Sequence, residues 1–200
     1  MALAMEKQTV VIPANWVPGP KQGEWTYHHY AALPDDGQRY EIIDGVLLMT
    51  PAPGIPHQKA AQHIFRYLAT LVEDAGLGQV FIAPVDVELS PTFLVQPDVI
   101  VILSAEAQKV TTNRIIGAPS LVVEVSSPST IGYDRREKQD AYARAGIPEY
   151  WIVHPGERTI EVLTLEGNEY SSLGIFSGQA TLLSKIVPTI CEVAAEKIFL

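Results

Sequence analysis

The chain has 200 residues, of which 47% are hydrophobic, and its 23 acidic and 14 basic residues give a formal net charge of −9 at pH 7. This length is enough for one domain with a sizeable core, and nothing in the composition marks a second one. The acidic balance excludes binding to nucleic acid by general attraction to phosphates, so DNA would require a local basic patch or bridging metal ions. The single cysteine, Cys191, excludes an internal disulfide.

Location and assembly are predicted from the same composition. No apolar run approaches the roughly 18 residues that cross a membrane, and the first residues lack the basic start and apolar stretch of a secretory signal. With one cysteine, this indicates a cytoplasmic protein that has no membrane partner. The mean hydropathy of +0.12 is high for a chain of this size, so we expect a homodimer that buries additional apolar surface.

The beginning of the chain predicts an arm, a short helix and a hairpin. Residues 1–24 are rich in Pro, Gly and Lys and are expected to form an N-terminal arm ahead of a single domain over residues 25–200. Residues 25–33 suit a short helix. Two apolar runs, 39–43 and 46–49, flank Asp44-Gly45, which is a strong signal for a β-hairpin.

The rest of the chain alternates helical and strand patterns. Helical spacing predicts helices over residues 57–75 and 134–145, each followed by a glycine. Short β-branched runs predict strands at 79–89 (one bent strand, or two divided near Pro84), 99–103, 121–125, 149–153, 159–165, 169–173 and 181–183. The order helix, strands, helix, strand, with antiparallel strands added at the end, predicts an α/β fold in which helices pack against a mixed sheet.

Two carboxylates fall in strands that have the composition of buried ones. Asp98 precedes the run 99–103, and Glu124 interrupts the run 121–125. Removing a carboxylate from water costs several kcal/mol of free energy unless a nearby partner compensates its charge. Two such groups in one small domain indicate a shared compensator, and a divalent cation is the simplest candidate.

Strand geometry could bring these two groups together. If the strands are antiparallel neighbours, the start of the first lies beside the end of the second, so Asp98 and Glu124 meet at one end of the sheet. The backbone carbonyl of Val125 lies at the same place. Two carboxylates, a carbonyl and waters suit an octahedral Mg²⁺ or Mn²⁺.

The following helix could add a cation to this end of the sheet. Asp134, Lys138 and Tyr142 have the i, i+4, i+8 spacing of one helix face. A lysine delivered next to Glu124 could orient or deprotonate an attacking water, or stabilise charge that develops on phosphorus.

These residues resemble the PD-(D/E)XK nuclease superfamily, and within it the Uma family of bacterial proteins classed as restriction endonucleases. The resemblance covers about residues 25–165. Its motifs are the stretches Leu33-Pro34-Asp35-Asp36-Gly37, Arg39-Tyr40-Glu41-Ile42-Ile43-Asp44-Gly45, Pro56-His57-Gln58, Gln96-Pro97-Asp98, Glu124-Val125-Ser126-Ser127-Pro128-Ser129-Thr130, Asp134 through Tyr142, and Gly146-Ile147-Pro148-Glu149-Tyr150-Trp151.

The resemblance implies a restriction-endonuclease-like core, made of a helix, a three-stranded meander, a helix and a strand. It also implies Asp98 and Glu124 as catalytic metal ligands, with Glu41 as a possible third carboxylate. The lysine that the superfamily places on the second acidic strand is replaced here by Ser126. In the Uma family the helix lysine, here Lys138, is the proposed replacement.

Structural roles remain open for each acidic residue. Asp98 could cap backbone amides after Pro97, and Glu124 could be the ion-pair partner of Arg114 or Lys138. Asp134 suits an N-cap or first-turn acid better than a ligand.

The remaining candidates have equally plain alternatives. Lys138 could be an ordinary solvated helix lysine, and Tyr142 could serve only in core packing. His57 suits a surface or capping role as well as a phosphate or water contact. The spacing of the other histidines, together with the single cysteine, makes a zinc site improbable.

We therefore expect a Mg²⁺- or Mn²⁺-dependent endonuclease that hydrolyses phosphodiester bonds in DNA. Asp98, Glu124 and Val125 would hold the metal, while Lys138 and Glu41 would complete the catalytic site. The alternative is a non-catalytic relative that uses the same cluster for stability and acts as a DNA-binding or interaction module. A basic patch from Arg114, Arg135, Arg136 and Arg144 near the site would favour the nuclease, and an uninterrupted acidic rim would favour the alternative.

Overall fold

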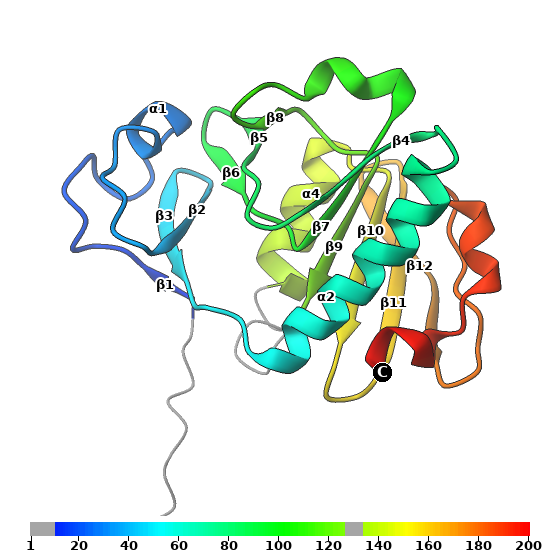
Figure 1. The fold of residues 1–200 in the computed structure, drawn as a ribbon. Coiled ribbons are helices and arrows are strands. Elements are labelled where there is room, and N and C mark those ends of the chain that lie inside the picture. The colour runs from blue at the N-terminus through cyan, green and yellow to red at the C-terminus, as the bar shows by residue number, and fades with distance from the viewer. Residues whose placement is uncertain (1–10, 127–133) are drawn as a thin grey trace, which may run out of the picture.

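A computed structural model describes residues 11–126 and 134–200 of the chain. Its centre is a six-stranded mixed sheet, the main sheet, in which only β9 and β10 run parallel (Figure 1). In spatial order the strands are β12 (Glu169–Ser177), β11 (Thr159–Glu166), β10 (Glu149–His154), β9 (Leu121–Val125), β7 (Val99–Leu103) and β4 (Gly78–Ile82). The predicted meander is therefore β4, β7 and β9, which pair antiparallel in this order.

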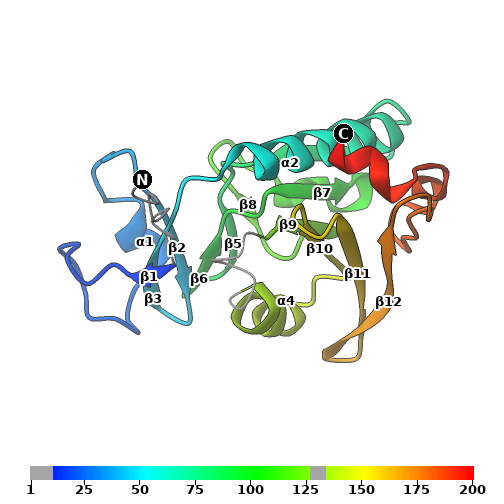
Figure 2. The same cartoon turned by 90° about the horizontal axis from the view of Figure 1, so that it is seen from below.

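Helices cover both faces of the main sheet. Seen from below, α2 lies on one face and α4 on the other (Figure 2). The helical segments are α1 (Tyr27–Tyr30), α2 (Ile55–Leu68), the π-helical turns η1 (Ala69–Glu73) and η3 (Asp134–Lys138), α4 (Gln139–Ala145), and the 3₁₀ segments η2 (Ser104–Lys109), η4 (Pro188–Glu192) and η5 (Ala195–Phe199). Gly146, with φ of +79°, ends α4 in the left-handed conformation that glycine adopts at low cost.

The alternation of side chains along the central strands separates two cores. Val99 and Val123 face α2 and pack with Ile64 of that helix. Ile100 and Val122, one position along, pack with residues of α4 on the opposite face. This is the pattern of strands buried on both faces, which explains why their sequences are apolar throughout.

A second, smaller sheet lies beside the main one and has the strand order β1-β3-β2-β6-β5-β8. Its strands are β1 (Ile12–Pro13), β3 (Val46–Thr50), β2 (Arg39–Ile43), β6 (Phe93–Val95), β5 (Val87–Ser90) and β8 (Ile115–Ile116). Ile43 and Phe93 of this small sheet join the same core as α4. The small sheet is therefore packed against the main body on the side that carries α4.

The hairpin around Asp44-Gly45 is confirmed as β2 and β3. Residues 79–89 form two strands divided near Pro84, which was one of the two predicted arrangements. The two strands, β4 and β5, belong to different sheets. The prediction of a strand at 181–183 is wrong. The structure has only an isolated β-bridge there, between Thr181 and Ala194. The backbone that follows turns away, because the amide of Lys185 donates to the buried carboxylate of Glu149 over 2.7 Å.

Part of the expected N-terminal arm contacts the small sheet. Ile12 and Pro13 pair with β3, and the amide of Ala14 donates to the carbonyl of Leu47 over 2.9 Å. Trp25 is only 1% exposed. Its side chain therefore belongs to the core of the small sheet and is not available as a contact for a second chain. Within the described ranges no helix is long and apolar enough to cross a membrane.

Candidate active site

Asp98 and Glu124 lie on neighbouring strands, as predicted. In the antiparallel pair β7–β9, Val99 is opposite Val123, so the next step of the same register places Asp98 opposite Glu124. The two residues are 6% and 5% exposed. Two buried carboxylates thus end the central strands at the same edge of the main sheet.

Asp98 is held by one backbone amide and one histidine. Its Oδ2 accepts a hydrogen bond from the amide of Val125 over 2.8 Å and lies 3.1 Å from Nε2 of His57. His57 is in the first turn of α2. Pro56 lies in the same turn, where proline is favoured because the backbone N–H it lacks would have no partner in the helix. The Asp98–His57 contact decides against a purely surface role for the histidine.

Lys138 is the cationic centre of the site. Its Nζ lies 2.9 Å from Oε1 of Glu124 and 3.0 Å from Oε1 of Glu41, and the residue is 5% exposed. The predicted direction of Lys138 toward Glu124 is confirmed, and a solvated helix lysine is ruled out. Arg114, the other partner considered for Glu124, instead pairs with Glu88 over 2.6 Å.

Tyr142 belongs to both the core and the site. Its side chain is fully buried, and its hydroxyl donates to Oε1 of Glu124 over 2.6 Å. Burial, and then the charge of Glu124, raise the pKa of Tyr142 well above its usual value. The hydroxyl therefore stays protonated at neutral pH and remains a donor to the carboxylate.

Glu41 brings a third carboxylate from the small sheet. Its Oε1 accepts from Lys138 and, over 2.9 Å, from the amide of Gln96. Its Oε2 is buried and has no hydrogen-bond partner in the described structure. An unpaired carboxylate oxygen at this depth is costly, and a cation is the kind of partner that would satisfy it.

The donor chemistry of the site fits a hard divalent cation. Asp98, Glu124 and Glu41 offer carboxylate oxygens, and Val125 offers a carbonyl at the same strand end. Across the described parts of the chain, no three His, Cys, Asp or Glu side chains are grouped so that they alone could hold a metal. Magnesium commonly takes only one or two carboxylates and completes its shell with water, so the two-carboxylate arrangement remains suitable.

Two of the four arginines considered for a basic patch are paired with carboxylates. Arg114 is engaged by Glu88, and Arg144 pairs with Asp44 over 3.0 Å. Arg136 is exposed. The side chains of Asp134 and Arg135, like residues 127–133 of the motif, lie outside the described part of the structure.

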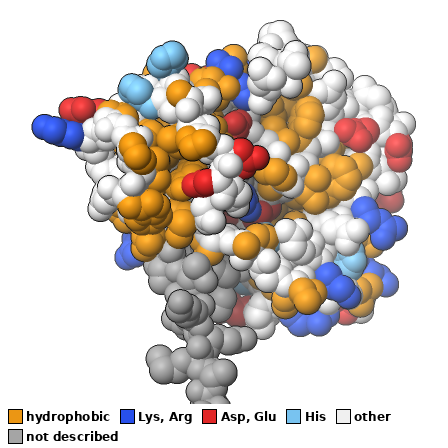
Figure 3. Space-filling view, turned by 60° about the vertical axis from the view of Figure 1, so that its left-hand side comes forward, with side chains coloured by type: hydrophobic (Ala, Val, Ile, Leu, Met, Phe, Trp, Pro, Cys, Tyr) orange, Lys and Arg blue, Asp and Glu red, His pale blue; other side chains and the backbone are white. Residues whose placement is uncertain are grey.

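Arg39 is the cation that shares a pocket with Asp98. This pocket of about 140 Å³ is also lined by His57, and Arg39 donates to the side chain and the carbonyl of Gln96. On the face shown in Figure 3, acidic side chains gather beside a basic one in the hollow between two apolar regions.

A three-stranded meander, a helix and a parallel strand, with carboxylates ending the central strands, define a restriction-endonuclease-like fold. The chain belongs to the Uma2 family, whose model is described as "putative restriction endonuclease" and matches residues 27–195. Among solved structures it is similar to a protein from Anabaena variabilis described as a "putative nuclease belonging to DUF820". That likeness has a TM-score of 0.70 at 18% identity and covers 87% of this chain and 97% of the other. Among curated proteins no match was found.

Two residues of the site had no role assigned from the sequence. Gln96 lies two residues before Asp98, and this spacing indicates that it is close to the site. Arg39 precedes Glu41 by two positions on a strand, so alternation places both on one face. That spacing could have identified Arg39 as a neighbour of the site.

Proposed function

We propose that this protein is a metal-dependent endonuclease that hydrolyses phosphodiester bonds in DNA. The observation that carries the proposal is the buried group of Asp98, Glu124 and Lys138 at the ends of adjacent strands in a restriction-endonuclease-like fold. Burying three ionisable groups at one edge is costly and is rarely retained for stability alone.

Asp98, Glu124 and the Val125 carbonyl would hold Mg²⁺ or Mn²⁺, and Glu41 would assist through its unpaired oxygen. Such an ion, when bound, supplies a Lewis acid for the phosphate and lowers the pKa of a bound water. His57 and the Val125 amide fix the orientation of Asp98.

The contacts of Lys138 support a role in proton transfer or charge stabilisation. Its ammonium is held between Glu124 and Glu41, and Tyr142 fixes Glu124 from the other side. In this role it would orient the attacking water or stabilise the negative charge that develops on the phosphate oxygens. Lys138 thus takes the function that the strand lysine has in the superfamily, while Ser126 occupies the strand position.

The purified protein is expected to nick or cut supercoiled plasmid when Mg²⁺ or Mn²⁺ is added. Conversion of plasmid to open-circular and linear forms on agarose gels measures this activity. Addition of excess EDTA should stop it, because the carboxylates alone cannot activate water. Cleavage that continues in excess EDTA would contradict the mechanism.

The second candidate function is that of a non-catalytic DNA-binding or interaction module. It is favoured by the pairing of Lys138 with both Glu41 and Glu124, which compensates one carboxylate oxygen of each residue without a metal. If the protein binds DNA but cleaves it with none of the divalent cations tested, the non-catalytic module is the correct function.

We further propose that the protein is a cytoplasmic homodimer. The outer edge of the main sheet is β12, where Ile175 is 64% exposed, and edge strands offer unpaired backbone groups to a second chain. Sedimentation equilibrium at micromolar concentration is expected to give twice the monomer mass of 21.9 kDa. Ile175→Lys should shift this equilibrium toward the monomer, and a monomeric parent would contradict the prediction.

A further inference from the structure

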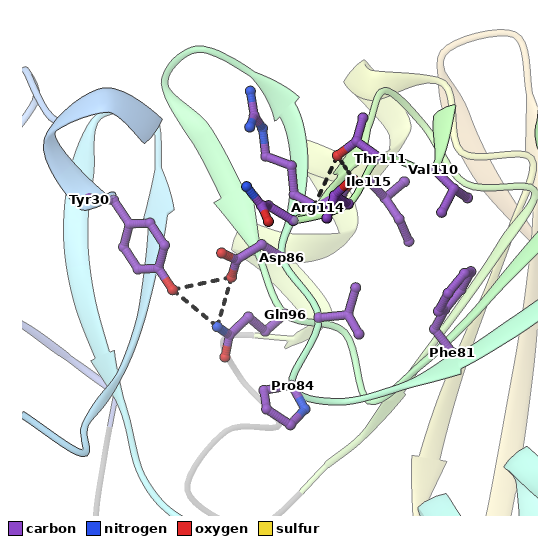
Figure 4. A pocket seen from close by; sticks show the side chains of 12 residues that line it. Tyr30, Phe81, Pro84, Asp86, Gln96, Val110, Thr111, Arg114 and Ile115 are labelled. Atoms are coloured by element: carbon purple, nitrogen blue, oxygen red, sulfur yellow. Dashed lines mark hydrogen bonds between the residues drawn. The ribbon is translucent and has the colours of Figure 1, made fainter. Parts of the chain in front are cut away.

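A second pocket lies next to the candidate active site. It has a volume of about 410 Å³, which is in the range of small-molecule sites. Pro84 lines both this pocket and the smaller one at Asp98, so the two pockets adjoin at that residue. Figure 4 shows its polar group, Tyr30, Asp86 and Gln96, opposite the apolar side chains.

The polar group is a carboxylate held in a fixed orientation. Oδ1 of Asp86 accepts from the Tyr30 hydroxyl over 3.2 Å and from Nε2 of Gln96 over 2.8 Å. The same Gln96 nitrogen also lies 3.3 Å from the Tyr30 oxygen. Oδ2 of Asp86 has no hydrogen-bond partner among the described residues, and the side chain is half-buried. This oxygen is therefore a positioned acceptor that remains available to a ligand.

The opposite walls are apolar and the rim is polar. Phe81, Val85 and Val110 line the slot, while Thr112 and Asn113 stand exposed at its rim. Apolar side chains on one side and a positioned hydrogen-bond acceptor on the other suit a planar heterocycle that carries a donor on its edge.

Gln96 connects this pocket to the candidate active site. The side-chain nitrogen of Gln96 donates to Asp86, and its side-chain oxygen accepts from Arg39. Its backbone N–H donates to Glu41. Arg39 has no acidic partner among the described residues and lines the Asp98 pocket, so it can contact a phosphate there. A phosphate at Asp98 and a base beyond Pro84 would then belong to one nucleotide.

We infer that this pocket binds one unpaired nucleobase of the substrate, next to the phosphate to be cleaved; the inference rests on the proposed function. The free oxygen of Asp86 favours a base that presents an exocyclic amino group. Cytosine places such a donor on its Watson–Crick edge. Uracil places carbonyl oxygens on both sides of its N3–H, and these would face the carboxylate. The pocket thus gives the enzyme a preference for amino-bearing bases.

The test compares binding of two matched single-stranded 12-mers, one of deoxycytidine and one of deoxyuridine, by fluorescence anisotropy with Ca²⁺ as the divalent cation. The parent protein is expected to bind the deoxycytidine 12-mer about 10-fold more tightly, which is typical of one discriminating contact to a base. Asp86→Asn should remove this preference, because the amide no longer offers a charged acceptor. Thr112→Trp should also reduce it by filling the slot.

Thr181→Trp adds the same bulk at an exposed residue outside the pocket and should keep the preference. Thermal unfolding of each variant checks its fold. Equal affinity of the parent for both 12-mers would overturn the inference, as would a preference that survives both pocket substitutions in folded protein.

The plasmid assay separates this inference from the proposed function. Metal-dependent cleavage by a protein that binds both 12-mers equally leaves the nuclease standing and removes the base pocket. A preference for deoxycytidine without any cleavage keeps the pocket and removes the catalytic role.

Discussion

Asp98→Asn and Glu124→Gln are each expected to reduce metal-dependent cleavage to background. Both substitutions keep the size of the side chain and an acceptor oxygen while removing one ligand charge. A site of two carboxylates tolerates that loss poorly, because waters must replace the charged ligand. Initial rates of plasmid nicking over a Mg²⁺ titration measure the effect.

Glu106→Gln is the matched control for these variants. Glu106 pairs with Lys109 and accepts from Ser120, which places it at the opposite end of β7 and β9 from the candidate site. Its replacement should leave cleavage unchanged, and thermal unfolding shows whether each variant is folded. An Asp98→Asn protein that cuts as well as its parent would end the metal-ligand assignment.

Lys138→Met is expected to destabilise the metal-free protein by about 3–5 kcal/mol, the usual cost of removing one partner from a buried ion pair. Without the ammonium, Glu41 and Glu124 are left buried with their charges uncompensated. Urea unfolding measures the loss. Cleavage should fall by about 10²–10⁴-fold if Lys138 acts in proton transfer.

Lys109→Met provides the comparison. The ion pair between Lys109 and Glu106 has side chains that are 24% and 32% exposed, and pairs this open to solvent contribute about 0–1 kcal/mol. Mn²⁺ should raise the urea midpoint of unfolding of Lys138→Met more than that of the parent. In the variant, Glu41 and Glu124 have lost the lysine ammonium, and the metal ion can compensate their charges. A Lys138→Met protein as stable as its parent would show that the buried pair contributes nothing to folding.

Several parts of this site could be predicted from local patterns. The turn residues Asp44-Gly45 predict the hairpin, and the β-branched runs predict β7 and β9 because strand propensity and alternation act over a few residues. Antiparallel pairing of those two strands then places Asp98 beside Glu124. Helical periodicity likewise places Lys138 and Tyr142 on the face that the structure turns toward Glu124.

The small sheet as a whole could not be predicted in this way, because its strands are short and pair across long stretches of chain. β6 has only three residues, and β8 only two. Their pairing depends on the division at Pro84, which sends two halves of one apolar run into separate sheets. No local pattern determines which sheet the second half joins.

The central strands, the two principal helices and the acidic pair follow from spacing and turn chemistry close along the chain. The surroundings of that pair depend on contacts between distant segments. Glu41 reaches Lys138 across 97 positions of sequence, and the amide of Gln96 meets Glu41 across 55. Contacts at such separations come from the packing of the small sheet against the α4 side of the main sheet, and that packing is set by the complementary shapes of two apolar surfaces.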